Sequence, residues 1–557
     1  MTGDPFTAQI IRNYLIATAK EMVETTVRTA YSPTFAEGRD FSCGIFDVAG
    51  RMVIQSFGIG VHLGALEGAL AAMRQRYPSV KEGDIIMTND PYVGTHQPDV
   101  IVCRPIFYQD RHVGFAVILG HWTDIGGAAA GGCAGTTTHV VQDGLIIPVC
   151  KLYDAGVLVE EIRDFILRNV RLPEDDWGDL QSQVAATHAA EARMRALMDR
   201  YGVEAVVDGM RQTIEYTRER FLTRLKAIPN GRYRAVEFME DDGLTDRRYE
   251  YVVTVDKRDD GFTVDFTGTS PQAPTPINGS IGATRAATYC AIIALVDTTI
   301  PANAGIFEQV EIIAPLGTIV NARPPAPVLA DTFELSKRVP EAILKAFADV
   351  LPDRVSAGCF CSGNNIAARF TDPATDEESL WYNFYEGGQG ATSRHDGNSG
   401  LYYWADSTWN QPIEVWEHKY PVLVDKYALI PDSGGAGKYR GGLGTVHEIR
   451  VLTGHHLSGV ADRHRIPPWG LAGGGNGRPN RWSIRRGEHQ EELQSFFGLR
   501  SPSKFYDLDI REGDVIVIET GGGGGFGPAA ERDPKAVERD LREGYITSAA
   551  GHRPDTG

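Results

Sequence analysis

Glycine is the residue type that most restricts how this chain folds. The 557 residues include 62 glycines, and many of them cluster in the last third of the chain. Glycine weakens helix interiors and favours tight turns, so this pattern excludes a mainly helical fold and indicates many short loops. A chain of this length also exceeds what one hydrophobic core usually holds, so we expect several lobes.

The charge balance restricts the partners of the chain. The formal net charge is −18, from 55 basic and 73 acidic residues. Nucleic acids and anionic membranes attract clustered Lys and Arg, so we expect no nucleic-acid partner and no membrane partner. No signal peptide is readable at the N-terminus, and no apolar run reaches the roughly 18 residues that span a bilayer. The 7 scattered cysteines are typical of reduced thiols, so the sequence predicts a cytoplasmic protein.

Hydrophobic periodicity predicts the elements of the N-terminal region. Apolar residues at helical spacing predict one helix over 5–30 and another over 63–76. Residues 41–47 and 51–55 have the pattern of a β-hairpin. Three further apolar runs predict a buried sheet whose loops carry polar residues: 84–88, 100–107 and 113–120.

The rest of the chain predicts an α+β fold with several lobes. Mixed sheets, a helical middle segment and a Gly-rich β C-terminal region are expected. The segment 157–227 looks helical with a break at Pro173, helices recur at 283–297 and 335–350, and strands are predicted at 232–240, 249–257, 262–267 and from 380 onward. The predicted domains are an α/β lobe at 1–156, a mainly helical segment at 157–228, an α+β lobe at 229–378 and a β-dominated lobe at 379–557.

Polar residues that flank the apolar runs form the strongest candidate site. His96 and Asp99 stand three apart with Pro98 between them, so a turn brings their side chains together more readily than a helix does. His121 follows the run that begins at Val113, where a strand passes into a loop. Two imidazoles and one carboxylate are a common ligand set for a divalent transition metal and leave coordination positions open. The alternative stays open: with 14 histidines, a chance His-x-x-Asp that caps a helix or pairs at the surface is common.

Asp124 has two alternative roles beside His121. A metal-bound histidine commonly donates its second ring N–H to a carboxylate, and Asp124 is placed to be that acceptor. The other interpretation is a turn residue that precedes Gly126 and Gly127.

Three tempting patterns are discounted. The glycine run at 521–527 matches G-x-G-x-x-G after a strand, but too few residues follow for the βαβ unit that a dinucleotide site needs. Gly437-Lys438 resembles the end of a P-loop, yet Asp432 and Tyr439 occupy the positions of its first Gly and its Ser/Thr. The aromatic segment 381–390 either lines a pocket or, more commonly, fills a core.

A series of motifs in one order gives the chain its strongest resemblance. The motifs are Arg39-Asp40-Phe41-Ser42, Val61-His62-Leu63-Gly64, Asn89-Asp90-Pro91-Tyr92, Gly94-Thr95-His96, Pro98-Asp99-Val100, Asp124-Ile125-Gly126-Gly127, Asp265-Phe266-Thr267-Gly268-Thr269-Ser270-Pro271, Pro431-Asp432-Ser433-Gly434-Gly435-Ala436-Gly437, Arg440-Gly441-Gly442-Leu443-Gly444, Pro468-Trp469-Gly470-Leu471 and the terminal glycine run. With them the chain resembles the hydantoinase B/oxoprolinase family, which also supplies the large subunits of acetone and acetophenone carboxylases. The resemblance extends from Asp4 to Tyr545.

The resemblance implies a two-component enzyme. A hydantoinase A-like partner would bind ATP and phosphorylate an amide or enolate oxygen, and this chain would act on that species at its own divalent metal. No ATP site is therefore expected on this chain. The carboxylases hold their metal with two His and one Asp, which match His96, Asp99 and His121, and Zn, Mn and Fe all remain open. His62 or Asp124 would move protons.

The resemblance leaves the reaction open. The leading hypothesis is ATP-dependent hydrolysis of a cyclic amide of hydantoin, oxoproline or lactam type within a hetero-oligomer, and the runner-up is ketone carboxylation. A non-catalytic scaffold and a mononuclear iron oxygenase are further alternatives, although that oxygenase usually spaces its first ligands as H-x-D. Family hydantoinases often carry two adjacent His where His121-Trp122 stands, and a Thr-Glu pair where Thr138-His139 stands. The substrate is therefore not carried over.

Overall fold

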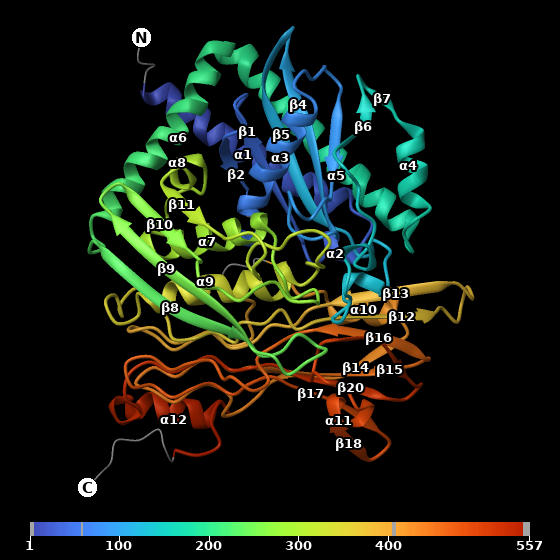
Figure 1. Cartoon of the computed structure of the whole chain (residues 1–557), viewed down its shortest axis with the longest axis vertical. Helices are drawn as coiled ribbons and strands as arrows, with labels where there is room; N and C mark the ends of the chain where they lie inside the picture. Colours follow the sequence, from blue (N-terminus) through green and yellow to red (C-terminus); the bar gives the residue numbers. More distant parts are fainter. Residues whose placement is uncertain (1–4, 57–58, 404–407, 550–557) are drawn as a thin grey trace.

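The computed structural model describes residues 5–56, 59–403 and 408–549. Figure 1 shows the N-terminal region at the top of the molecule, the C-terminal region at the bottom and the middle of the chain between them. Four β-sheets occur in these described residues. None of the helices in this part of the chain is long and apolar enough to cross a membrane.

A seven-stranded sheet forms the first part of the chain, in the order β2-β1-β5-β4-β3-β6-β7. The predicted hairpin is β1 and β2, and the three predicted apolar runs are β3, β4 and β5. The strands are β1 (Phe41–Phe46), β2 (Met52–Gln55), β3 (Ile85–Thr88), β4 (Asp99–Tyr108), β5 (Arg111–His121), β6 (Cys150–Asp154) and β7 (Val157–Leu158).

Helices cover both faces of this sheet, which explains why its central strands are apolar throughout. Successive side chains of β5 enter different cores: Val117 and Leu119 pack in one, and Ala116 and Ile118 pack in the other. The predicted opening helix, second helix and helical middle segment are confirmed. The helices are α1 (Pro5–Thr29) and α5 (Pro173–Tyr201) on one face, α3 (Leu63–Arg76) and α7 (Ile281–Val296) on the other, with α4 (Glu160–Leu167) and α6 (Val203–Leu225) beside them.

A four-stranded sheet in the order β11-β10-β9-β8 follows. Its strands are antiparallel except for β10 and β11, which are parallel. The helix predicted over 335–350 is α9, which begins after a π-helical turn, η4. The elements are β8 (Gly231–Met239), β9 (Tyr249–Arg258), β10 (Gly261–Asp265), β11 (Val310–Ile313), α8 (Ala304–Phe307), η4 (Asp331–Leu335) and α9 (Ser336–Ala346).

Two sheets build the C-terminal region, in the orders β13-β12-β16-β19 and β14-β15-β20-β17-β18. Trp381, Trp482 and Ile516 are among the side chains that fill the core between them. A last helix, α12, follows the glycine run. The elements are β12 (Asn365–Thr371), β13 (Glu378–Asn383), α10 (Ile413–Lys419), β14 (Val422–Leu429), β15 (Thr445–Val451), β16 (His455–Val460), β17 (Arg481–Arg486), β18 (His489–Glu492), α11 (Leu493–Phe497), β19 (Phe505–Ile510), β20 (Val515–Glu519) and α12 (Pro534–Arg542). Short helices are α2 (Pro33–Ala36), η1 (Gly60–His62), η2 (Ala130–Gly132), η3 (Val140–Gln142) and η5 (Ala529–Glu531).

The glycine run after β20 packs against other glycine-rich segments, and we call this assembly the glycine bundle. Gly523 donates its backbone N–H to Gly442 O at 2.9 Å, and Gly525 donates to Gly475 O at 2.9 Å. A Cβ atom on Gly523 would lie 2.0 Å from Gln389 O, so only glycine fits there. The bundle consists of residues 521–527 with parts of 387–390, 434–442 and 470–477.

The predicted α+β class with mixed sheets is confirmed. The predicted domain boundaries stay a prediction. The sheets themselves divide at other residues, because β7 lies past position 156 and belongs to the first sheet. Similarly, β12 lies before position 378 and pairs with β16 of the C-terminal region.

Candidate metal centre and adjoining cavity

Sheet pairing places Asp99 and His121 together. Asp99 is the first residue of β4, His121 is the last residue of β5, and the two are paired in the antiparallel register. Residues directly opposite each other in such a pair project to the same face. Both side chains are buried, so the predicted pair meets inside the protein and not at its surface.

A turn before β4 brings His96 to the same point, as the sequence predicts. The N–H of Asp99 donates to His96 O at 3.1 Å, which closes the turn. His96 Nε2 lies 3.4 Å from Asp99 Oδ2, and the ring centroids of His96 and His121 are 5.0 Å apart. Leu329 O lies 2.7 Å from His96 Nδ1 and, as an acceptor only, places a hydrogen on that nitrogen.

His62 also reaches this group. Its Nε2 lies 3.8 Å from Asp99 Oδ1, while Ser42 Oγ hydrogen-bonds with its Nδ1 at 3.1 Å. His62 ends the short helix η1 and is 2% exposed. The structure therefore brings together four of the five residues singled out from the sequence.

The residue types at this point, two imidazoles and a carboxylate, suit a divalent cation in their chemistry. Both ring nitrogens of His121 and Asp99 Oδ1 are buried and have no hydrogen-bond partner among the described residues. Buried polar atoms are usually satisfied, so these three atoms are candidates to bind a ligand. As the side chains stand, no set of three His, Cys, Asp or Glu in the described chain already has metal-binding geometry. Metal binding by His96, Asp99 and His121 therefore stays a prediction.

Burial and mutual charge separate the protonation states of these groups. Burial opposes a charge on His96, but the carboxylate of Asp99 raises the pKa of His96 to about 9. Burial and the neighbouring His96 lower the pKa of His121 to about 3, so His121 is neutral. Burial would raise the pKa of Asp99, yet His96 and His62 hold it well below its usual range. An ionised carboxylate and a neutral imidazole are the forms that bind metals, so Asp99 and His121 have the required form, whereas His96 would have to lose a proton first.

Asp124 does not accept a hydrogen bond from His121, so the interpretation of Asp124 as the acceptor for that ring is wrong. Its Oδ2 accepts the backbone N–H of Gly126 at 2.8 Å and of Arg171 at 3.0 Å. Its Oδ1 accepts the Arg171 guanidinium at 3.0 Å and the N–H of Gly131 at 3.3 Å. Asp124 is therefore the turn residue of the alternative interpretation and anchors a loop. Proton transfer by Asp124 stays a prediction that this geometry does not support.

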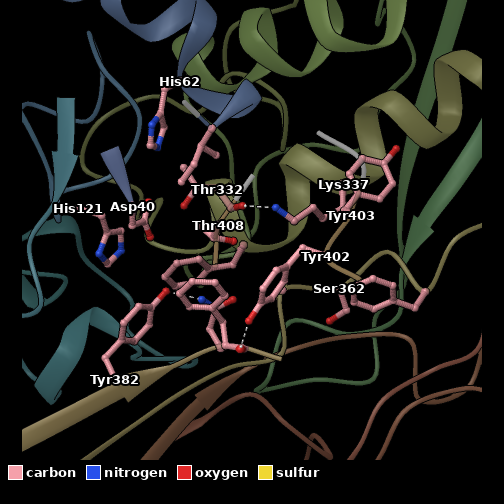
Figure 2. A pocket seen from close by; sticks show the side chains of 16 residues that line it. Asp40, His62, His121, Thr332, Lys337, Ser362, Tyr382, Tyr402, Tyr403 and Thr408 are labelled. Atoms are coloured by element: carbon pink, nitrogen blue, oxygen red, sulfur yellow. Dashed lines mark hydrogen bonds between the residues drawn. The ribbon is translucent and has the colours of Figure 1, made fainter. Parts of the chain in front are cut away.

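A cavity of about 50 Å³ opens beside the histidines. A water molecule needs about 10–15 Å³, so the cavity holds a few small groups. Figure 2 shows Asp40, His62 and His121 on one side and Lys337, Tyr403 and Ser362 on the other. Five aromatic residues line much of the remaining wall: Phe333, Phe360, Tyr382, Phe384 and Tyr402.

Several residues at this site were not identified from the sequence. Asp40 immediately precedes β1, and its O accepts the backbone N–H of His121 at 3.0 Å. It belongs to one of the motifs that carry the resemblance, which was the available signal. Tyr382 lies in the aromatic segment for which a pocket was one interpretation. Thr332 and Lys337 had no local signal, because only the tertiary fold brings η4 and α9 to the cavity.

The glycine run does not form a phosphate-binding loop. A phosphate loop offers its backbone N–H groups to the ligand. Here the N–H groups of Gly522, Gly523, Gly524 and Gly525 all donate to backbone carbonyls elsewhere in the protein. These N–H groups are therefore already used within the protein, and the absence of a dinucleotide site stays a prediction.

Similarity to known proteins agrees with these motifs. The Hydantoinase B/oxoprolinase family matches residues 4–529. The chain belongs to the Hydantoinase B/oxoprolinase family. It is 33% identical over 564 residues to the putative B subunit of the D-/L-hydantoinase of Pseudomonas sp. (strain NS671), covering 98% of this chain and 93% of that one.

One further relative is similar in sequence, and two solved structures are similar in fold. The beta subunit of the caprolactamase of Pseudomonas jessenii is 30% identical over 564 residues, with 98% of this chain and 94% of that one covered. The crystal structure of ATP-dependent caprolactamase from the same organism superposes with a TM-score of 0.90 at 29% identity, covering 99% of this chain and 96% of that chain. Nucleotide-free acetone carboxylase has the same fold, with a TM-score of 0.88 at 20% identity over 99% of this chain and 79% of that chain.

Proposed function

We propose that this chain is the B-type catalytic subunit of an ATP-dependent cyclic amide hydrolase. The observation that carries the proposal is the convergence of His96, Asp99 and His121 beside a cavity, with unsatisfied donor atoms at their meeting point. Two relatives that match nearly the whole chain carry the names of B and beta subunits, which supports dependence on a partner. A hydantoinase A-like chain that binds ATP is the proposed partner.

His96, Asp99 and His121 would hold a divalent ion, and Asp40 is a fourth candidate ligand from the cavity wall. Such an ion supplies Lewis acidity toward water and toward a carbonyl oxygen. His62 Nε2 lies 3.8 Å from Asp99 Oδ1, and Ser42 hydrogen-bonds with the other ring nitrogen of His62. The aromatic wall excludes bulk water and seats the apolar part of the substrate.

The division of labour follows from chemistry. An amide carbonyl is a poor electrophile, and phosphorylation of its oxygen by the partner would make the carbon far more reactive toward water. This chain would then position that activated carbon and the attacking water within one small, water-poor cavity. The proton released on attack would leave through His62, whose ring borders the cavity.

The test is turnover by the co-expressed pair of chains. The complex is supplied with ATP and, in separate reactions, hydantoin, 5-oxoproline and caprolactam, and both the ring-opened product and inorganic phosphate are measured. Either chain alone should be inactive. Turnover that requires bicarbonate and a ketone instead of a cyclic amide would replace the proposal with the carboxylase alternative. Cyclic amide turnover by the partner alone would make this chain a scaffold.

A further inference from the structure

Lys337 places a positive charge in the wall of the cavity. It is the second residue of α9, and it is 4% exposed. Figure 2 shows its side chain across the cavity from Asp40 and His121. Among the described residues that line the cavity, Asp40 is the single carboxylate, and it lies on that opposite side. The end of the cavity that Lys337 borders is therefore suited to an anion.

Arg338, the next residue of α9, has a different environment. Successive side chains of a helix point about 100° apart, so the two neighbours enter different parts of the protein. The Arg338 guanidinium donates to the buried carboxylate of Asp462 at 2.6 Å. Two acceptors of Lys337 are instead uncharged: Thr332 O and Ser336 Oγ, each 3.1 Å from its Nζ. The ion pair with Asp462 uses Arg338, whereas Lys337 borders the cavity.

Thr332 connects Lys337 to the proposed metal centre. Its carbonyl oxygen accepts the Lys337 ammonium, and its hydroxyl lies 3.1 Å from His96 Nε2. One residue therefore separates the ammonium from a proposed metal ligand. In an amide whose oxygen is phosphorylated, the attacked carbon and the phosphorus atom are joined through a single oxygen. A cation that binds this phosphate must lie close to the point of attack, and Lys337 meets that condition.

We propose that the Lys337 ammonium binds the phosphate group of the activated substrate. The assignment rests on the proposed function, in which the partner places a phosphate on the amide oxygen. A phosphate oxygen that enters from the cavity accepts from Nζ on the side away from α9. Because Lys337 is buried, little water screens the attraction between the two charges. The phosphate therefore stays bound, with its carbon beside the metal centre, until the ring opens.

The first experiment is Lys337→Met in the complex with its partner, supplied with ATP and the best cyclic amide substrate. Methionine keeps much of the length of the side chain but removes its charge. We expect the rate of ring opening to fall about 100-fold. More inorganic phosphate should be released per ring opened, because the activated substrate escapes and decays in solution. Lys337→Arg retains a cation and should stay within about tenfold of the wild-type rate. A wild-type rate and coupling in Lys337→Met would overturn the inference.

Lys345→Met is the matched control. Lys345 lies on the same helix but donates to Glu237 at 2.6 Å, and neither residue lines the cavity. Glu237 retains Arg463 as a partner, so this variant should fold and keep the wild-type rate and coupling.

Two substrates distinguish a bound phosphate from a bound carboxylate. 5-Oxoproline carries a carboxylate and caprolactam does not, while both are phosphorylated under the proposed function. Phosphate binding by Lys337 predicts that Lys337→Met is impaired with either substrate. An effect confined to 5-oxoproline would show that Lys337 binds the substrate carboxylate, and the phosphate assignment would be wrong.

A binding measurement separates this inference from the proposed function. Inorganic phosphate is titrated by calorimetry into the full chain alone, so that the proposed partner contributes nothing. The affinity should weaken about tenfold in Lys337→Met and stay unchanged in Lys345→Met. If no cyclic amide turns over but this difference is found, the function fails and the phosphate subsite stands. Equal phosphate affinity in Lys337→Met and wild type, or no phosphate binding by wild type, would refute the subsite even if cyclic amides turn over.

Discussion

Asp99 and His121 are register partners at one end of the antiparallel pair β4 and β5. The hydrogen-bond register of the sheet, and not a loop conformation, therefore sets the separation of the proposed carboxylate and imidazole ligands. A slip of one residue in β5 would turn His121 to the other face of the sheet. One end of a strand pair within the seven-stranded sheet thus holds two residues of the proposed centre.

Loss of the Asp99 carboxylate should remove the metal without unfolding the chain. Asp99→Asn preserves the volume of the side chain but weakens the proposed ligand set, and elemental analysis should show much less bound divalent metal. Coupled activity of the complex should fall by at least about 100-fold. Asp242→Asn is the control, because Asp242 is equally buried but hydrogen-bonds to Thr245 and Tyr249 away from the cavity. Full metal occupancy in Asp99→Asn would refute the proposed centre.

Substitution of Asp124 should affect stability more than chemistry. Asp124→Ala leaves the Arg171 guanidinium and the N–H groups of Gly126 and Gly131 without their acceptor. We expect the free energy of unfolding to fall by about 1–3 kcal/mol, measured by urea denaturation, with metal content retained. Metal loss from a variant of wild-type stability would show instead that Asp124 supports the metal centre.

Local sequence patterns predicted the framework of the site but not its surroundings. Apolar runs predicted β4 and β5, because a strand is encoded by the residues within it. The proposed ligands at the ends of these strands could therefore be recognised from the local sequence. The acceptor of the His96 ring, Leu329 O, lies on a segment far away in the chain, and so does Arg171, which binds Asp124. No periodicity or motif encodes such pairings, since they follow from the packing of separate lobes.

Glu334 should make stability depend on pH. Burial raises the pKa of Glu334 to about 7, although Arg338 opposes this, and Asp462 and Lys504 also face it. The folded state then keeps a proton that the unfolded chain releases, so the stability contributed by Glu334 falls as pH rises from about 4.5 to about 7. Glu334→Gln carries no such proton. The variant should therefore be more stable relative to wild type at about pH 8 than at about pH 5, which means a larger difference in the free energy of unfolding in its favour.

Denaturant unfolding at both pH values checks this expectation. Glu538→Gln, at an exposed position on α12, is the control and should show the same difference from wild type at each pH. An identical pH dependence in Glu334→Gln and wild type would show that Glu334 is ionised in the folded state throughout.

A single methyl group in the glycine bundle should prevent folding. In Gly523→Ala the new Cβ would lie 2.0 Å from Gln389 O, a backbone atom that cannot move aside alone. We expect little soluble protein, measured as the yield of monodisperse chain after expression. Gly487→Asn is the control: Gly487 has φ 63° with no atom within 4 Å of its Cβ position, and Asn tolerates this conformation. A soluble Gly523→Ala chain with wild-type stability would contradict the packing described.

The glycine bundle also determines when the chain can finish folding. Residues 521–527 supply backbone hydrogen bonds to partners at Gly358, Gly388, Gly442 and Gly475, all made earlier in synthesis. The backbone groups of those partners stay unpaired until almost the whole chain has been synthesised, because residues 521–527 come last. Contacts of such long sequence separation form slowly and leave incomplete chains prone to aggregation. Truncation before residue 521 would therefore remove more than a tail. It would remove the segment that completes a network of backbone hydrogen bonds whose first partner, Gly358, lies more than a hundred residues upstream.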